Sequence, residues 1–257
     1  MKIRILSDLH LEFYKRPEKA NIRDDVDCDL VVLAGDTHTS TIGIAWAGRT
    51  FSRPTLYVMG NHVMGNHEFF GKDAPILLIK ARALAAERGV HLLERDELEI
   101  LGQRFLGCTL WTGFDSGPLP WSHVARVAHP VMADFAEIRS DGRLISPNRM
   151  VEWYDRDVAW LEGALRPSAP AVVVTHFAPT WAVTNPQFGP GDEMTAYFHS
   201  NLEHLMGDAV PLWIYGHNHW SADTTIVTPK GTTRVVSNQL GYRDEECGFD
   251  AGLVIDL

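Results

Sequence analysis

The chain has 257 residues, of which 45% are hydrophobic and 22% are charged, a balance typical of a globular protein. Its 33 acidic and 23 basic side chains give a formal charge of −10, and no stretch is rich in Lys and Arg. Surfaces that bind nucleic acids or anionic membranes need clustered cations, so we expect neither kind of partner.

Two short apolar runs near the N-terminus each lead into polar side chains. The run at 2–7 predicts a strand that is followed by Asp8 and His10, alternate residues that share one face of an extended chain. The nearly continuous run at 29–34 predicts a strand buried on both faces, and it stops at Asp36. Both strands therefore present potential metal ligands at their ends.

A perfect tandem repeat follows a short predicted helix at 41–51 and a third predicted strand at 55–58. Residues 58–68 read V-M-G-N-H-V-M-G-N-H-E, so a carboxamide and an imidazole occur twice. The first copy supplies Asn61 and His62, and the second supplies Asn66 and His67. We favour the first copy as the functional one, because it is tethered to the strand and the chain after it can absorb five extra residues at small entropic cost. The second copy would then bulge at the rim of a pocket.

The middle of the chain predicts helices, a hairpin and one irregular segment. Residues 75–88 have a helical apolar stripe that ends at a glycine, and residues 98–107 read as two strands joined by a tight turn. Prolines interrupt residues 112–146, where a helix is expected around 122–128; a long excursion of this kind often forms a rim or lid. A capped helix follows at 147–165.

Two more buried strands in the second half end in histidines. The run at 171–174 leads into His176, and the run at 212–215 leads into His217 and His219. Closing antiparallel strands are predicted at 224–227, 234–237 and 253–257. The order of elements predicts an α/β fold with two sheets and outer helices.

The cysteines, and the absence of a linker or a long apolar segment, indicate what kind of protein this is. The cysteines Cys28, Cys108 and Cys247 are odd in number and widely spaced, which indicates reduced thiols and argues against a structural zinc site. No linker divides the chain, so we expect one domain over residues 1–257. No segment has the length and apolar character of a signal peptide core or a membrane span, and we expect a cytoplasmic protein. Oligomeric state is not encoded in any pattern we recognise.

Polar residues after apolar runs form a consistent series. In chain order the series reads D-x-H, G-D, G-N-H, T-H and G-H-x-H. One such residue alone is more often a cap or turn residue than a ligand, but five segments together favour one shared site. Carboxylate, carboxamide and imidazole ligands suit Mn, Fe or Zn.

With these segments in this order, the chain resembles the calcineurin-like metallophosphoesterase superfamily over nearly its whole length. The resemblance implies a four-layer α/β/β/α sandwich of two mixed sheets flanked by helices, and a centre of two divalent transition-metal ions. It also implies that Asp36 bridges the ions, that Asp8, His10 and His219 complete one site, and that Asn61 (or Asn66), His176 and His217 complete the other.

The resemblance further implies hydrolysis of a small-molecule phosphate ester. Two ions about 3.5–4 Å apart supply a bridging hydroxide for in-line attack on phosphorus. The histidine of the Gly-Asn-His step, His62 or alternatively His67, would act as a catalytic group and not as a ligand, stabilising charge or protonating the leaving oxygen.

Departures from the usual pattern of the superfamily bear on the substrate. Phe177 follows His176 where bacterial relatives often have a second histidine, and Gln239-Leu240 stands where they often have Pro-Arg. Both changes remove a polar or charged group, so we expect phosphodiesters, or bulkier and less charged esters such as triesters, to be preferred over dianionic monoesters. Rim positions that could contact the substrate are His38, His123 and Phe177, although a solvated loop is the simpler reading for His38.

Two alternative functions compete with this one. A nuclease of the same superfamily would share the ligands, but the acidic balance argues against it. A metal-bound interaction module, with its site disabled by the repeat, would show no turnover. Metal-dependent hydrolysis of a panel of esters and single-stranded DNA separates the three.

Overall fold

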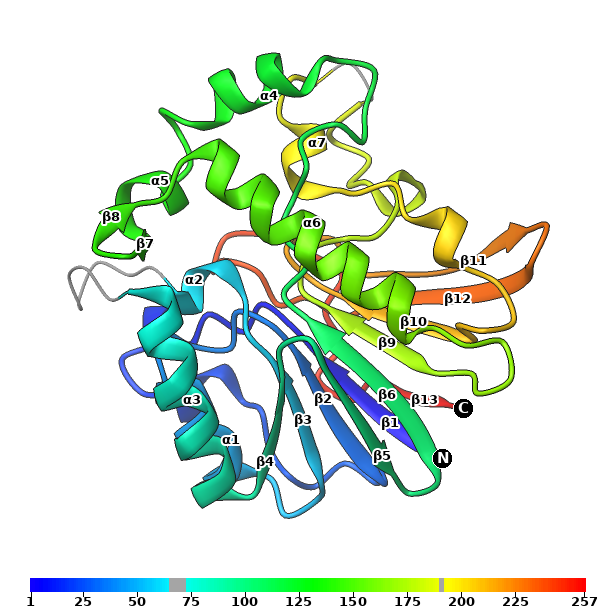
Figure 1. The fold of residues 1–257 in the computed structure, drawn as a ribbon. Helices are drawn as coiled ribbons and strands as arrows, with labels where there is room; N and C mark the ends of the chain where they lie inside the picture. The colour runs from blue at the N-terminus through cyan, green and yellow to red at the C-terminus, as the bar shows by residue number, and fades with distance from the viewer. Residues whose placement is uncertain (65–72, 190–191) are drawn as a thin grey trace.

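The computed structural model describes residues 1–64, 73–189 and 192–257, and two large β-sheets lie at its centre (Figure 1). The first copy of the repeat falls within these ranges. Residues 65–72, which include Asn66 and His67 of the second copy, lie outside the described residues.

The first sheet has five strands in the order β13-β1-β2-β3-β4. Strands β1 to β4 run parallel to one another, and β13 pairs antiparallel with β1 at one edge. Their bounds are β1 Lys2–Leu6, β2 Leu30–Ala34, β3 Thr55–Val58, β4 Val90–Leu93 and β13 Val254–Asp256. The parallel arrangement brings the carboxyl ends of four strands to one edge of the sheet.

The second sheet has six strands in the order β11-β12-β10-β9-β6-β5. Its four inner strands are parallel, and an antiparallel hairpin closes each side. Their bounds are β5 Asp96–Ile100, β6 Gln103–Cys108, β9 Val172–Thr175, β10 Leu212–Tyr215, β11 Ala222–Thr228 and β12 Gly231–Ser237. The predicted antiparallel pairing of the closing strands is confirmed for β11 with β12 and for β13 with β1, and β12 also pairs parallel with β10 on its other side.

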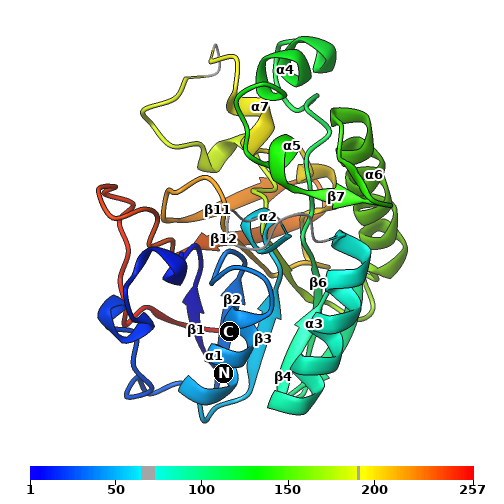
Figure 2. The same cartoon turned by 90° about the vertical axis from the view of Figure 1, so that its left-hand side faces the viewer.

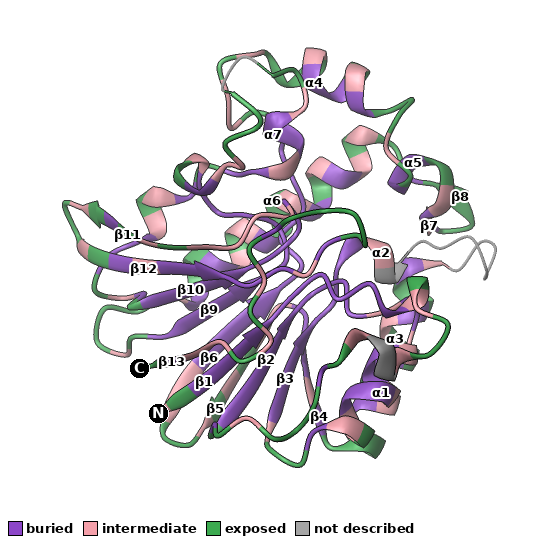
Figure 3. Ribbon diagram, turned by 180° about the vertical axis from the view of Figure 1, so that it is seen from behind, coloured by how far each residue is buried: buried purple, intermediate pink, exposed green. Residues whose placement is uncertain are grey.

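The inner faces of the two sheets pack against each other. Alternate residues of each strand form this layer, among them Ile3 and Ile5 of β1 and Val172 and Val174 of β9, and all four are fully buried. Figure 3 shows the inner strands of both sheets as buried along most of their length, whereas the edge strands β5, β11 and β13 are largely intermediate or exposed. Burying side chains of this size contributes about 1.5–3 kcal/mol each, so this layer holds the sheets in one relative position.

Helices cover the outer faces. Helices α1 (Ile42–Thr50) and α3 (Ala74–Arg88) cover the five-stranded sheet, and α6 (Pro147–Ala164) lies over the six-stranded sheet (Figure 1). The predicted start of α6 is present, since the Ser146 hydroxyl accepts a hydrogen bond from the backbone N–H of Arg149. The four layers confirm the predicted α/β/β/α sandwich. Among the described helices, none is long and apolar enough to cross a membrane.

The irregular segment at 112–146 contains more structure than its sequence predicts. It forms α4 (Trp121–Ala128), α5 (Asp134–Glu137) and a small hairpin of β7 (Arg139–Ser140) and β8 (Arg143–Leu144). Figure 2 shows α4 and α5 together with α7 (Thr195–Phe198), beyond the ends of the central strands. The remaining short elements are η1 (Leu11–Phe13), η2 (Pro17–Ala20), α2 (Asn61–Met64), η3 (Trp181–Val183) and η4 (Glu203–Leu205).

One buried charge on α6 interrupts its apolar face. The carboxylate of Asp157 is fully buried and accepts hydrogen bonds from the Arg95 guanidinium, at 2.5 Å, and from the backbone N–H of Leu110, at 2.9 Å. Arg95 also pairs with buried Glu94. This network joins α6 to the chain after β4 and β6, and each charge depends on the others for its burial.

Candidate metal centre

The predicted ligands all follow the carboxyl ends of parallel strands. Because these ends meet where the two sheets come together, residues far apart in sequence become neighbours. In chain order, Asp8 and His10 follow β1, Asp36 follows β2, Asn61 follows β3, His176 follows β9, and His217 and His219 follow β10.

The backbone turns sharply at most of these residues. The φ angles are positive at Asp8 (49°), His10 (42°), Asp36 (44°), His217 (76°) and His219 (47°). This left-handed conformation costs a non-glycine residue about 1–3 kcal/mol and persists only where the surrounding structure imposes it. Such strain at five neighbouring polar residues is typical of a functional site.

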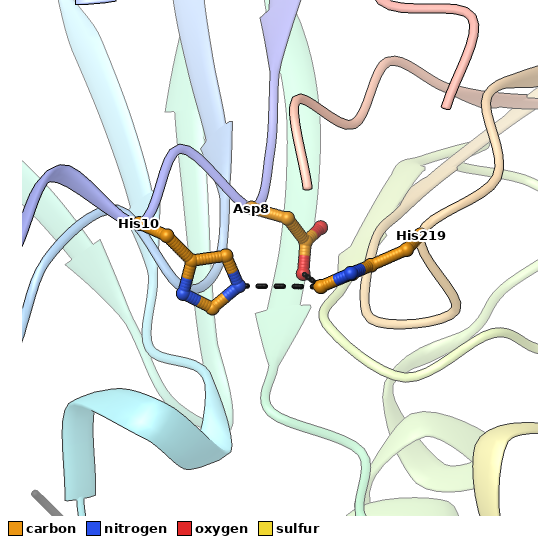
Figure 4. Close-up of side chains that lie close together, drawn as sticks. All are labelled: Asp8, His10 and His219. Carbon is orange, nitrogen blue, oxygen red and sulfur yellow. Dashed lines mark hydrogen bonds and ion pairs between the residues drawn. The ribbon is translucent and has the colours of Figure 1, made fainter. Parts of the chain in front are cut away.

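The first cluster consists of Asp8, His10 and His219, whose side chains point toward one another (Figure 4). The Nε2 atoms of His10 and His219 are 3.2 Å apart, and His219 Nε2 is 3.6 Å from Asp8 Oδ1. Two facing imidazole nitrogens can share at most one proton, whereas a cation between them accepts both lone pairs. The backbone N–H of His217 and the Ser7 hydroxyl donate to the Asp8 carboxylate and fix its orientation.

The second cluster consists of Asp36, His176 and His217, all buried. His176 Nε2 is 3.2 Å from Asp36 Oδ2 and 2.9 Å from Asn61 Oδ1. The Nε2 atom of His217 is buried and makes no hydrogen bond within the described part of the chain. A buried nitrogen without a partner is costly, and a metal ligand has this property before its ion binds.

Electrostatics in the second cluster favour a cation. Burial opposes ionisation of Asp36, but the charge of His176 and the contact with it hold the pKa of that carboxyl far below its usual range. Burial also opposes charging of His176, but Asp36 outweighs it and raises the pKa to about 9. For His217, burial and then the neighbouring His176 lower the pKa well below its usual value, which keeps this imidazole neutral and able to bind a metal.

Two glycines are required by close approach to the ligands. A Cβ atom on Gly60 would lie 2.0 Å from Asp36 Oδ1, and one on Gly216 would lie 2.1 Å from Ser7 Oγ and 2.5 Å from Asp8 Oδ2. Any other residue would displace a carboxylate from its cluster. The donor set, the unpartnered nitrogen of His217 and this tight backbone packing therefore fit two divalent cations.

His62 lies beside the two clusters and is not a member of either. Its backbone N–H donates to Asp36 Oδ1 at 3.0 Å, its Nδ1 is 3.3 Å from Glu12 Oε1, and its Nε2 is 3.3 Å from the Tyr242 hydroxyl. Burial opposes charging of His62, but Glu12 and then Asp36 raise its pKa to about 9. Burial also opposes ionisation of Glu12, but contacts with His10 and His62 lower its pKa to about 2. His62 is thus placed and charged to donate a proton.

A cavity of about 840 Å³ opens beside the second cluster and His62. One wall is apolar and comes from the segments around α5 and α7: Val131, Met132, Phe188, Met194 and Phe198. Carboxylates also line it, namely Asp36, Asp134, Asp192, Asp244, Glu245 and Glu246. No Lys or Arg occurs among the described residues that line this cavity.

The three predicted rim residues do not line the cavity. His123 on α4 pairs with Glu193 at 2.7 Å, and His38 makes a hydrogen bond to Thr39. Phe177 is fully buried, with its ring 3.8 Å from the His217 ring, centroid to centroid. The expectation of a substrate contact is corrected for Phe177, because its side chain supports a candidate ligand from behind.

Four polar residues near the centre were missed by sequence reasoning. Glu12 and Tyr242 contact His62, Asp134 contacts Asn61, and Glu245 contacts His219 at 2.5 Å. Residues 8–12 read D-L-H-L-E, so Glu12 alternates with Asp8 and His10 on one face of an extended chain, and this pattern could have indicated it. The other three come from irregular segments that carry no periodic pattern.

Comparison with known proteins identifies the family. The calcineurin-like phosphoesterase family matches residues 1–221, most of the chain. The chain belongs to this family. Calcineurin-like phosphoesterases generally bind a dinuclear metal centre, and the two clusters could hold such metals.

Two relatives illustrate how far the likeness extends. An uncharacterised protein of Acanthamoeba polyphaga mimivirus is 22% identical over 294 residues, which span 99% of this calcineurin-like phosphoesterase and 96% of the viral protein. The crystal structure of a phosphopantetheinyl hydrolase from Mycobacterium tuberculosis superposes with a TM-score of 0.71 at 18% identity, covering 96% of this chain and 93% of that one. At this identity the second likeness shows the fold.

Proposed function

We propose that the protein is a dinuclear metal-dependent phosphoesterase that hydrolyses phosphodiesters, and also bulkier, less charged esters such as triesters. The observation that carries this proposal is the placement of two His/Asp clusters next to each other at one cavity. The clusters are coupled directly, since the backbone N–H of His217 in the second donates to Asp8 in the first. The ions would be Mn, Fe or Zn, which suit carboxylate, imidazole and carboxamide donors.

Each residue has a distinct role in this proposal. Asp8, His10 and His219 would hold one cation, and Asn61, His176 and His217 the other, with Asp36 between them. When bound, the cations would polarise the phosphoryl oxygens and provide a nucleophile from water at neutral pH. His62 would donate its proton to the departing oxygen of the ester, while the Glu12 carboxylate, 3.3 Å from the other ring nitrogen, stabilises the charged imidazolium.

The charges around the cavity support the choice of substrate class. A dianionic monoester gains from several nearby cationic side chains, and the described lining offers His62 but no Lys or Arg. Additional anionic groups on a substrate would face the carboxylates of the lining, whereas a second, apolar ester substituent would meet Val131, Met132 or Phe198. Diesters and triesters carry less charge and more apolar surface, so they suit this cavity better.

The same charge pattern disfavours the nuclease alternative. Binding a nucleic acid backbone requires several Lys or Arg contacts to phosphates, and a lining rich in carboxylates would repel it. The orphaned nitrogen of His217 and the strained ligand backbone fit a bound ion, which a metal-bound interaction module would share, so turnover is what separates that alternative from the hydrolase.

Metal reconstitution with a panel of substrates tests the proposal. The protein is stripped with a chelator, reloaded with Mn²⁺, Fe²⁺ or Zn²⁺, and assayed on p-nitrophenyl phosphate, bis(p-nitrophenyl) phosphate, an aryl dialkyl triester, a phosphopantetheinyl diester and single-stranded DNA. We expect turnover only with metal, and higher kcat/KM on a diester than on the monoester. A preference for the monoester would refute the substrate class, faster cleavage of DNA would favour the nuclease, and no turnover on any substrate would refute the hydrolase.

A further inference from the structure

Asp134 is a buried carboxylate in the segment that was expected to be only a rim. It is the first residue of α5, it is 4% exposed, and it is 73 residues from Asn61 in sequence. Neither the sequence pattern nor the proposed chemistry gives it a role. A carboxylate this deeply buried needs partners that compensate for its desolvation.

The two oxygens of Asp134 have different partners. Oδ1 accepts a hydrogen bond from Asn61 Nδ2 at 3.0 Å, and Oδ2 accepts one from the Tyr197 hydroxyl. Tyr197 is fully buried on α7, so the segments that carry α5 and α7 meet at this carboxylate. Both segments also contribute residues to the cavity wall.

The contact with Asp134 decides which way the Asn61 carboxamide faces. An ionised carboxylate only accepts hydrogen bonds, so it must face the NH₂ end of the amide. The carbonyl oxygen Oδ1 of Asn61 is then directed to the other side, where it lies 2.9 Å from His176 Nε2 in the second cluster. Only this oxygen can bind a cation; the NH₂ group, if turned inward, would repel one.

We infer that Asp134 is a positioning residue that fixes the Asn61 carboxamide with Oδ1 toward the second metal cluster. The inference rests on the proposed function, because it takes Asn61 as a ligand of the second cation. It gives the rim segment an indirect part in metal binding, with α5 and α7 joined to the Asn61 side chain through one carboxylate. Outer partners of metal ligands commonly change affinity by about 10- to 100-fold when removed.

The matched variants are Asp134→Leu and Asp134→Asn, whose side chains have the same number of heavy atoms and the same branching as aspartate. Leucine removes both acceptors, whereas asparagine keeps one carbonyl oxygen that can still accept from Asn61 Nδ2. Calorimetric titration of the metal-free protein with Mn²⁺ measures the affinity of each site. We expect Asp134→Leu to weaken one of two binding events by about 10- to 100-fold and to leave the other within about 3-fold, and Asp134→Asn to stay close to the wild type.

A double-mutant cycle separates positioning from a general structural role. If Asp134 acts through Asn61, the double variant Asp134→Leu/Asn61→Ala should bind Mn²⁺ almost as tightly as the single variant Asn61→Ala. Tyr197→Phe, which leaves the contact between Asp134 and Asn61 in place, should have a small effect. Additive losses, equal weakening of both sites, or unchanged binding in a folded Asp134→Leu variant would overturn the inference.

The outcomes also separate this inference from the proposed function. Affinity for Mn²⁺ is measured without any ester, so a selective loss in Asp134→Leu would support the positioning role even if no ester were hydrolysed. Conversely, a wild-type protein that hydrolyses diesters, together with normal Mn²⁺ binding in Asp134→Leu, would refute the positioning role and leave the hydrolase intact.

Discussion

Replacing Asp36 by Asn is expected to lower kcat/KM for bis(p-nitrophenyl) phosphate by roughly a thousandfold or more, about 4 kcal/mol of transition-state stabilisation. The Asp36 carboxylate is buried, contacts His176 and accepts a hydrogen bond from the backbone N–H of His62, so it links the second cluster to the proposed general acid. An amide of the same shape removes the negative charge that two cations would share. Steady-state kinetics with saturating Mn²⁺ measures the effect.

The control for Asp36→Asn is the same substitution at a surface carboxylate. Asp223 is exposed and forms an ion pair with Arg234 at the surface. Exposed ion pairs contribute little to stability. Asp223→Asn should leave kcat/KM within about 2-fold of the wild type. If Asp36→Asn kept a tenth or more of the wild-type value, the bridging role would have to be abandoned.

The second large effect concerns the repeat. His62→Ala should lower kcat by about 100- to 10,000-fold, the usual contribution of a general acid, while His67→Ala should have little effect. The reason is that the first copy makes the contacts of a built site: the Asn61 oxygen lies against His176, and the His62 backbone donates to Asp36. The two variants change the same residue type five positions apart, so each serves as the control for the other.

The opposite pattern would reassign the site to the second copy. If His67→Ala abolished turnover and His62→Ala did not, Asn66 and His67 would be the functional pair. Deleting residues 63–67 gives an independent measure, because it removes one unit of the repeat and keeps Asn61 and His62. We expect hydrolysis to survive this deletion and the relative kcat/KM for diester and monoester to change; unchanged substrate preference would refute a role of the second copy at the pocket rim.

The sequence was most informative where strands are buried on both faces. The runs that became β2 and β9 are nearly continuous β-branched and apolar residues, and no other element type fits such short segments well. Strand β4 was missed because Val90–Leu93 follows α3 after a single glycine and has only four residues, one of them a histidine. Its identity as a strand comes from pairing with β3, which sequence pattern alone does not reveal.

The candidate ligands were predictable because strand ends are local features. Asp8, Asp36 and His176 each stand within two residues of the end of a strand, and the parallel order of strands brings them together. The supporting residues were not predictable in the same way. Asp134 and Tyr242 reach the centre from irregular segments, and only the tertiary fold shows which side chains they meet.

The predicted contact between Phe177 and the substrate was wrong, although Phe177 is the sequence neighbour of a candidate ligand. It follows His176 directly, so a position at the substrate rim was a natural expectation. Strand β9 ends at Thr175, and in the bend that follows, the Phe177 ring is buried against the His217 ring and does not line the cavity. The aromatic side chain of Phe177 therefore affects how the candidate ligand His217 is packed. The charges that line the cavity are the stronger evidence for a diester substrate.

Anomalous scattering from crystals of the Mn²⁺-reconstituted protein locates the metal ions and their ligands. We expect two peaks in the anomalous difference map, one between Asp8, His10 and His219 and the other between Asn61, His176 and His217, with Asp36 contacting both. A single peak, or a second peak bound by Asn66 in place of Asn61, would contradict it.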